Sequence, residues 1–122
     1  MASLIVATGA ARGDYFPLGM RTNVIGRDEA LPIQIVDPKV SRKHLQIRHD
    51  RQNGHYTAVD MKSKHGVRIN GARLENERIL ADNDYITLGE TTLLFTERDF
   101  RDRQSALEHF KRVGERSKPT LD

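Results

Sequence analysis

The chain has 122 residues, of which 37% are hydrophobic and 30% charged, so it suits a single domain with a modest core. It contains no cysteine, which excludes disulfide bonds, thiolate nucleophiles and zinc–thiolate sites. The formal net charge is +3 with basic and acidic residues interspersed, which argues against a broad basic face for nucleic acid. Because no apolar run reaches the roughly 18–20 residues that span a bilayer and the first residues do not resemble a signal peptide, we expect a cytoplasmic protein that binds no membrane.

Short β-favouring runs separated by turn residues occupy most of the chain. The second of these runs contains Pro17, which predicts an edge strand or a bulge. Asn53-Gly54 and Asn70-Gly71 are dipeptides typical of hairpin turns. The runs expected to form strands are 3–8, 15–20, 23–25, 33–36, 44–48, 56–59, 67–69, 85–88 and 92–96. With no helical periodicity before residue 98, this spacing predicts an antiparallel β-sandwich of roughly nine or ten strands.

The C-terminal segment has a different pattern. Apolar residues recur at helical spacing over 107–113, and Asp99 is placed to cap a helix that Gly114 and later Pro119 would end. The predicted helix either packs on the sandwich or serves as a dimerising or linker helix. Residues 115–122 are polar and are expected to be mobile.

Two neighbouring stretches carry the chemistry of an anion site. Gly26 at a strand end allows a close backbone approach, and Arg27 supplies a planar fork suited to phosphate. The tetrapeptide 41–44 then combines the hydroxyl of Ser41 with the cations Arg42 and Lys43. The ring of His44 is expected to brace the loop by holding a backbone carbonyl. Together these residues predict a phosphate site.

A third stretch, 60–71, is a polar loop followed by a hairpin turn. Lys64 is a candidate phosphate cation and His65 a candidate donor to a peptide backbone. Gly66 permits a positive φ, and Asn70-Gly71 is expected to set a tight hairpin. We expect Gly66, Asn70 and Gly71 to support the site and not to touch a ligand.

The three stretches together resemble the forkhead-associated (FHA) domain. The matching motifs are Gly26-Arg27, Ser41-Arg42-Lys43-His44, the segment Asp60 to Gly71, and a closing Asp82-x-Asp84-x-Ile86-x-Leu88-Gly89. The resemblance implies an eleven-stranded FHA-like β-sandwich of the SMAD/FHA type whose loops at one end bind a phosphothreonine peptide. It further implies that Arg27 and Ser41 hold the phosphate, that Arg42 adds contacts, and that the loop at 63–66 reads the phosphothreonine and its neighbours, so that Lys64 and His65 are candidate phosphopeptide-binding residues. Gly26 and His44 would then be architectural.

The loop at 63–66 departs from the family pattern. The family has Ser or Thr followed by Asn where this chain has Lys64 and His65, and it has Thr where this chain has Val67. The Asn is the residue expected to grip the main chain of the ligand. Lys64 adds charge in exchange, and His65 offers a pH-sensitive donor.

These observations leave three interpretations of function. The first is a phosphothreonine-dependent signalling adaptor, without a cofactor or metal, whose partner is phosphorylated by a Ser/Thr kinase. The second is an FHA-like domain that binds a partner or self-assembles without phosphate, which the altered positions 64–65 motivate. The third is self-association through a phosphorylated Thr8 or Thr120.

Catalysis is not expected, because no nucleophile motif, P-loop or paired carboxylates occur. The expected organisation is an FHA domain at 1–97 and a C-terminal helix and tail at 98–122, with a homodimer through the helix as an alternative to a monomer.

Overall fold

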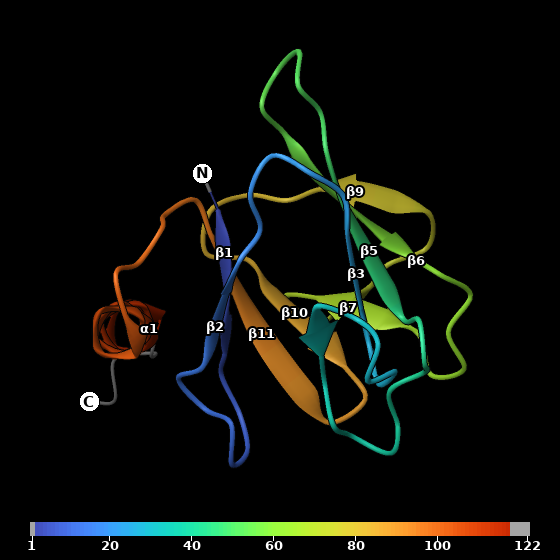
Figure 1. The fold of residues 1–122 in the computed structure, drawn as a ribbon, viewed down its shortest axis with the longest axis horizontal. Coiled ribbons are helices and arrows are strands. Elements are labelled where there is room, and N and C mark those ends of the chain that lie inside the picture. Colours follow the sequence, from blue (N-terminus) through green and yellow to red (C-terminus); the bar gives the residue numbers. More distant parts are fainter. Residues whose placement is uncertain (1, 118–122) are drawn as a thin grey trace.

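Two β-sheets face each other and a helix lies against one of them in a computed structural model that describes residues 2–117 (Figure 1). The strand order is β2-β1-β11-β10-β7-β8 in the first sheet and β4-β3-β5-β6-β9 in the second. The strands are β1 (Ser3–Val6), β2 (Tyr15–Pro17), β3 (Asn23–Gly26), β4 (Ile33–Gln34), β5 (Leu45–His49), β6 (Tyr56–Asp60), β7 (Val67–Ile69), β8 (Ala72–Arg73), β9 (Glu77–Ile79), β10 (Tyr85–Leu88) and β11 (Thr91–Thr96). The predicted β-sandwich with a C-terminal helix is therefore confirmed.

The alternation of side chains along β1 and β11 explains why each strand contains an unbroken apolar run, Leu4 to Val6 in β1 and Leu93 to Phe95 in β11. Leu4 and Phe95 are register partners that point between the two sheets, where they join the main core. Ile5 and Leu94 are the next pair, so they point to the opposite face of the first sheet. A strand that is covered on both faces has no polar side, which fits the unbroken apolar runs in the sequence.

The helix α1 (Arg103–Ser117) covers the outer face of the first sheet. Ala106, Phe110 and Val113 are buried there against Ile5 and Leu94. The apolar stripe of the helix thus packs on its own sandwich, as the first of the two sequence interpretations expected.

Both predicted ends of the helix need correction. The N-cap is Asp102 and not Asp99, because Asp102 Oδ1 accepts hydrogen bonds from the backbone N–H and the hydroxyl of Ser105, each at 2.9 Å. The bond from the Ser105 N–H is the main cause that holds the pKa of Asp102 below its usual value. At the other end the helix continues through Gly114 to Ser117. Glycine costs only about 1 kcal/mol inside a helix, so it need not end one. Pro119 and most of the tail predicted to be mobile lie outside the described residues.

The hairpins differ in detail from the sequence expectation. Asn70 and Gly71 both have positive φ, 52° and 84°, and form the predicted two-residue turn. The turn leads into β8, which the sequence prediction missed, and β9 was missed as well. The loop between β5 and β6 is longer than the predicted two-residue turn. The N–H of Asp50 donates to the carbonyl of His55, which closes the loop, and within it Gly54 is the residue with a positive φ.

The sheet edges carry the remaining irregular features. Pro17 lies on β2, which is the edge of the first sheet, as predicted. Eight of the nine strand pairings are antiparallel, and the exception is the parallel pair of β3 with the edge strand β4.

Over the part of the chain that the structure describes, no helix is both long and apolar enough to cross a lipid bilayer.

Candidate functional site

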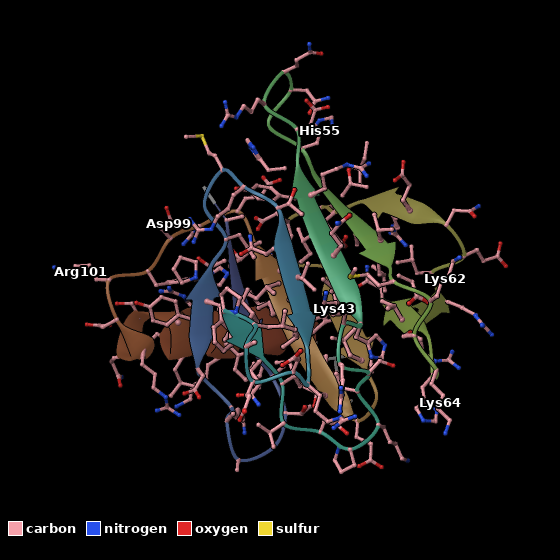
Figure 2. All side chains as sticks on the ribbon, turned by 45° about the vertical axis from the view of Figure 1, so that its right-hand side comes forward. Lys43, His55, Lys62, Lys64, Asp99 and Arg101 are labelled. Atoms are coloured by element: carbon pink, nitrogen blue, oxygen red, sulfur yellow. The ribbon has the colours of Figure 1, made fainter. Side chains whose placement is uncertain are left out.

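Three loops that are distant in the sequence meet at one end of the sandwich. They are the residues after β3, the segment before β5 and the segment between β6 and β7. Figure 1 shows all three of these segments toward the lower right, whereas the β5–β6 hairpin lies at the top. Figure 2 likewise shows Lys64 and His55 at opposite ends. The three stretches singled out in the sequence are thus brought together.

Gly26 is required because another backbone segment lies directly against it. A Cβ atom built on Gly26 would lie 2.1 Å from the carbonyl oxygen of Arg42 and 2.9 Å from that of Ser41. Its φ is not positive, so conformational freedom is not the reason for the glycine. The contact seats the 41–44 loop on the end of β3, and Arg42 O also accepts the Asp28 N–H at 3.2 Å.

Arg27 is an exposed side chain whose orientation is fixed at one atom. Its Nε donates a 2.9 Å hydrogen bond to the carbonyl of Val40, and its backbone N–H donates to Ser41 O at 3.0 Å. Within the described residues the two terminal nitrogens of the guanidinium have no hydrogen bond or ion pair. Arg27 therefore presents two oriented donors to solvent beside Ser41, which suits an anion with several oxygens.

Ser41 joins the second loop to the third. Its Oγ accepts the backbone N–H of Lys64 at 3.2 Å. Because that bond uses only a lone pair, the hydroxyl proton of Ser41 remains available to donate to a ligand. The Lys64 side chain is exposed on the same loop, where Figure 2 shows it extending away from the sandwich.

His44 is fully buried and links the same two loops from beneath. Its Nδ1 accepts the backbone N–H of Ser41 at 3.0 Å, so in the neutral ring the proton is on Nε2. Nε2 then donates to the carbonyl of Gly66 at 2.7 Å. His44 thus holds a backbone carbonyl, which is the contact the sequence predicted, although it lies one residue before β5 and not within it.

The third loop is held by its own side chains. Asp60 Oδ1 accepts the N–H of Ser63 at 3.0 Å, and Ser63 Oγ accepts the N–H of Gly66 at 3.0 Å. Gly66 has a φ of 79°, as the sequence suggested. Val67, which stands where the family pattern has Thr, is completely buried in the core and presents nothing to a ligand.

Arg42 and His65 are exposed members of this end of the molecule. His65 lines a cavity of 190 Å³ together with Lys39, Arg68 and Thr87. Sequence reasoning gave no role to Lys39 or Arg68, although Arg68 lies within the 60–71 segment.

Asn70 and Gly71 lie at the far end of β7 from Gly66. Asn70 Nδ2 donates to Asp84 at 2.9 Å, and its Oδ1 accepts the Tyr85 N–H at 2.9 Å. These bonds fix the β7–β8 turn on β10. Their support of the site is therefore indirect, through the position of β7.

Asp37 is a buried carboxylate near the site that the sequence analysis missed. It accepts the N–H of Lys39 at 2.9 Å, the N–H of Glu90 at 2.9 Å and the hydroxyl of Thr91 at 2.8 Å. Burial by itself raises the pKa of Asp37, but these hydrogen bonds outweigh it and hold the pKa below its usual value. Asp37 thus ties the loop before β5 to the β10–β11 turn. An Asp before Pro38 is the sequence signal that would have pointed to a turn-forming carboxylate.

The arrangement is chemically suited to binding a small anion. It combines an oriented guanidinium, a free hydroxyl proton and the ammonium of Lys64, all at the surface. Among the described residues, no group of three His, Cys, Asp or Glu side chains is positioned to hold a metal ion.

Comparison with known proteins is consistent with this geometry. The sequence profile of the FHA domain matches residues 23–89. The oxoglutarate dehydrogenase inhibitor of Corynebacterium diphtheriae is 33% identical over 94 residues, which are 77% of this chain but only 64% of that protein. A domain from a structural and functional analysis of phosphothreonine-dependent FHA domain interactions has 31% identity and a TM-score of 0.70, with 81% of this chain and 98% of that domain covered. The FhaA FHA domain, complexed with the intracellular domain of Rv3910, has 33% identity and a TM-score of 0.69, with 78% and 99% covered.

Proposed function

This chain belongs to the FHA domain family, and on that premise we propose that it is a phosphothreonine-dependent protein–protein interaction module. Arg27 and Ser41 bind the phosphate, and the ammonium group of Lys64 makes a third contact to it. The observation that carries the proposal is that the exposed Arg27 is tied to the loop of Ser41 by its Nε bond to Val40 O and its backbone bond to Ser41 O, while the described residues leave its two terminal nitrogens without a partner. A phosphothreonine carries roughly two negative charges and three acceptor oxygens, which match this set of donors.

Arg42 and His65 contact the peptide on either side of the phosphate in this proposal. Both are exposed, and neither side chain makes a hydrogen bond within the described residues. His65 takes the place of the family's Asn, so its ring N–H replaces an amide N–H toward the ligand backbone. Gly26, His44 and Gly66 support the site by fixing the loops, and Asn70 and Gly71 support it through β7.

The partner is a protein phosphorylated on threonine by a Ser/Thr kinase, and the chain acts in signal transduction without catalysing a reaction. Phosphorylation by such kinases takes place inside cells, and the FhaA domain was crystallised with an intracellular domain, which supports a cytoplasmic setting. We also propose the division into an FHA domain at 1–97 and a helix-containing segment at 98–122.

A homodimer through α1 remains an alternative to a monomer. The burial of Ala106, Phe110 and Val113 against the sandwich leaves the helix with less apolar surface for a second copy. Sedimentation of the chain over a range of concentrations tests this alternative directly.

Phosphate-independent binding is the second candidate function, and the replacement of the family's Asn by His65 is the observation that favours it. Titration of peptide pairs that differ only by phosphate on one threonine separates the two candidates. A phosphothreonine peptide array provides the starting sequence. Binding that requires the phosphate supports the first candidate, whereas equal affinity for both members of each pair supports the second. Self-association through a phosphorylated Thr8 or Thr120 is tested by phosphorylating the chain. Thr120 lies outside the described residues.

A further inference from the structure

The guanidinium of Arg27 takes its orientation from one backbone carbonyl. Its Nε donates to Val40 O at 2.9 Å, and within the described residues the side chain makes no other hydrogen bond or ion pair. The Val40 side chain is buried, and the Val40 N–H donates to the backbone carbonyl of Asp37 at 2.9 Å. The direction in which Arg27 points therefore depends on how firmly the turn at 37–40 is held.

Asp37 holds that turn with both oxygens of its carboxylate. Its Oδ1 accepts the N–H of Lys39 at 2.9 Å, within the turn itself. Its Oδ2 accepts the N–H of Glu90 at 2.9 Å, from the β10–β11 turn, and the hydroxyl of Thr91 at 2.8 Å, from the first residue of β11. Asp37 is only 6% exposed, so these bonds are shielded from water, and bonds to a charged acceptor are stronger than bonds between neutral groups.

Glycines allow a close approach on either side of the 37–40 turn. A Cβ atom on Gly89 would lie 3.0 Å from Asp37 Oδ2 and 2.9 Å from Lys39 Cβ, and Gly89 also has a φ of 58°. Gly26, at the end of β3, lies against the carbonyls of the residues that follow the turn. The 37–40 turn is thus held between the end of β3 and the β10–β11 turn.

We infer that Asp37 is the positioning residue for Arg27: anchored by Thr91 and the β10–β11 turn, it fixes the carbonyl that orients the guanidinium. The inference rests on the proposed function, in which Arg27 binds the phosphate. Asp37 is buried and acts through the turn, without contact to the ligand. The β10–β11 turn consequently influences phosphate affinity, although none of the residues proposed to bind the phosphopeptide lies on it.

The charge of Asp37 makes the sign of its effect diagnostic. A carboxylate near the site repels a phosphate, so removing its charge would by itself strengthen phosphopeptide binding. Asp37→Asn keeps the size of the side chain but offers one acceptor oxygen where the carboxylate offers two. Because Lys39 and Glu90 donate to different oxygens, their N–H groups cannot both keep their partner, and the turn loosens. Weaker binding in Asp37→Asn therefore reports lost positioning and cannot come from the lost charge.

Calorimetric titration with a phosphothreonine peptide selected from the array measures the effect, at a temperature at which every variant is folded. Asp37→Asn should weaken binding by about five- to ten-fold, since a misdirected guanidinium loses part of its charge-assisted bonds. Thr91→Val removes one hydrogen bond without changing the charge and should weaken binding by about three- to five-fold. Thr91→Ser retains the hydroxyl and should bind as wild type does.

Two further measurements separate positioning from a general loss of stability. The Nε–H of Arg27 gives its own signal in a nitrogen-correlated NMR spectrum, and its bond to Val40 O should slow the exchange of this proton with water. Asp37→Asn should shift this signal and speed the exchange. Phe110→Ala removes a buried side chain of α1 on the outer face of the first sheet, so it should change neither the Arg27 signal nor the phosphopeptide affinity.

The outcomes separate this inference from the function beneath it. Equal or tighter phosphopeptide binding by Asp37→Asn, or an unchanged Arg27 signal in that variant, overturns the inference. A loss of affinity in Phe110→Ala as large as that in Asp37→Asn overturns it too, because reduced stability would then explain both. If wild type binds no phosphopeptide, the proposed function fails. The Arg27 signal needs no ligand, so in that case it still decides whether Asp37 positions the guanidinium.

Discussion

Replacing His44 by alanine removes the buried link between two of the loops proposed to bind phosphate. The ring accepts the Ser41 N–H at 3.0 Å and donates to Gly66 O at 2.7 Å, and it has no exposed surface. Each buried group left without a partner costs about 1–3 kcal/mol. We therefore expect His44→Ala to lower the free energy of unfolding by about 3 kcal/mol or more, which corresponds to a melting temperature lower by roughly 10 °C.

Two further variants separate the contributions of the two bonds. His44→Asn retains an acceptor near the Nδ1 position and so preserves the bond from the Ser41 N–H. His44→Gln retains a donor near the Nε2 position and so preserves the bond to Gly66 O. Each should lose about half as much stability as His44→Ala, whereas His55→Ala, in an exposed position at the other end, should have little effect.

Urea denaturation at neutral pH measures these free energies, and titration with a phosphothreonine peptide measures the effect on the site. Binding should weaken in His44→Ala even at temperatures where the variant is fully folded, because Ser41 and the 63–66 loop lose their fixed positions. A His44→Ala variant with unchanged stability and unchanged peptide affinity would refute the bracing role.

Three other predictions concern packing, pH and the helix. Gly26→Ala should destabilise the chain by about 3 kcal/mol or prevent folding, because its Cβ would lie 2.1 Å from Arg42 O; Gly54→Ala, with no atom within 4 Å, is the control for urea denaturation and should cost only about 1 kcal/mol. The pKa of Asp37 is lower in the folded chain than its unfolded value near 3.8, so its contribution is present above that pH and is lost as the pH falls through the folded pKa. The difference in unfolding free energy between wild type and Asp37→Asn should consequently shrink below about pH 4, and a constant difference down to pH 2 would contradict this. Phe110→Ala should cost about 3 kcal/mol in thermal unfolding without changing phosphopeptide affinity, and a loss of affinity in the folded variant would show that α1 contributes to the site.

The sequence was informative where a residue's role depends on its neighbours in the chain. Gly26-Arg27 and the Ser41–His44 tetrapeptide could be recognised because each motif is short and its spacing is fixed. The Asn70-Gly71 turn could likewise be predicted, since two positive φ values require these residue types.

The features that were missed depend on pairings across long separations. The strands β8 and β9 contain only two and three residues, all exposed, so no alternating pattern announces them. The Asp37 bonds to Glu90 and Thr91, and the Lys39–Glu90 pair, join residues more than fifty positions apart. The choice of Asp99 over Asp102 as the helix cap was wrong because an aspartate precedes helix-compatible residues at both positions, and only the structure shows that Asp102 accepts the N–H of Ser105.

The most direct test of the account is a calorimetric titration of one phosphothreonine peptide and its unphosphorylated twin against wild type and Arg27→Ala. Removing two charge-assisted hydrogen bonds of about 1.5–3 kcal/mol each should weaken phosphopeptide binding by about 100-fold or more, while thermal stability changes little because Arg27 is exposed. The unphosphorylated peptide should bind neither protein measurably. Equal affinity of wild type for the two peptides, or full affinity in Arg27→Ala, would contradict the claim that this guanidinium and the Ser41 hydroxyl bind the phosphate.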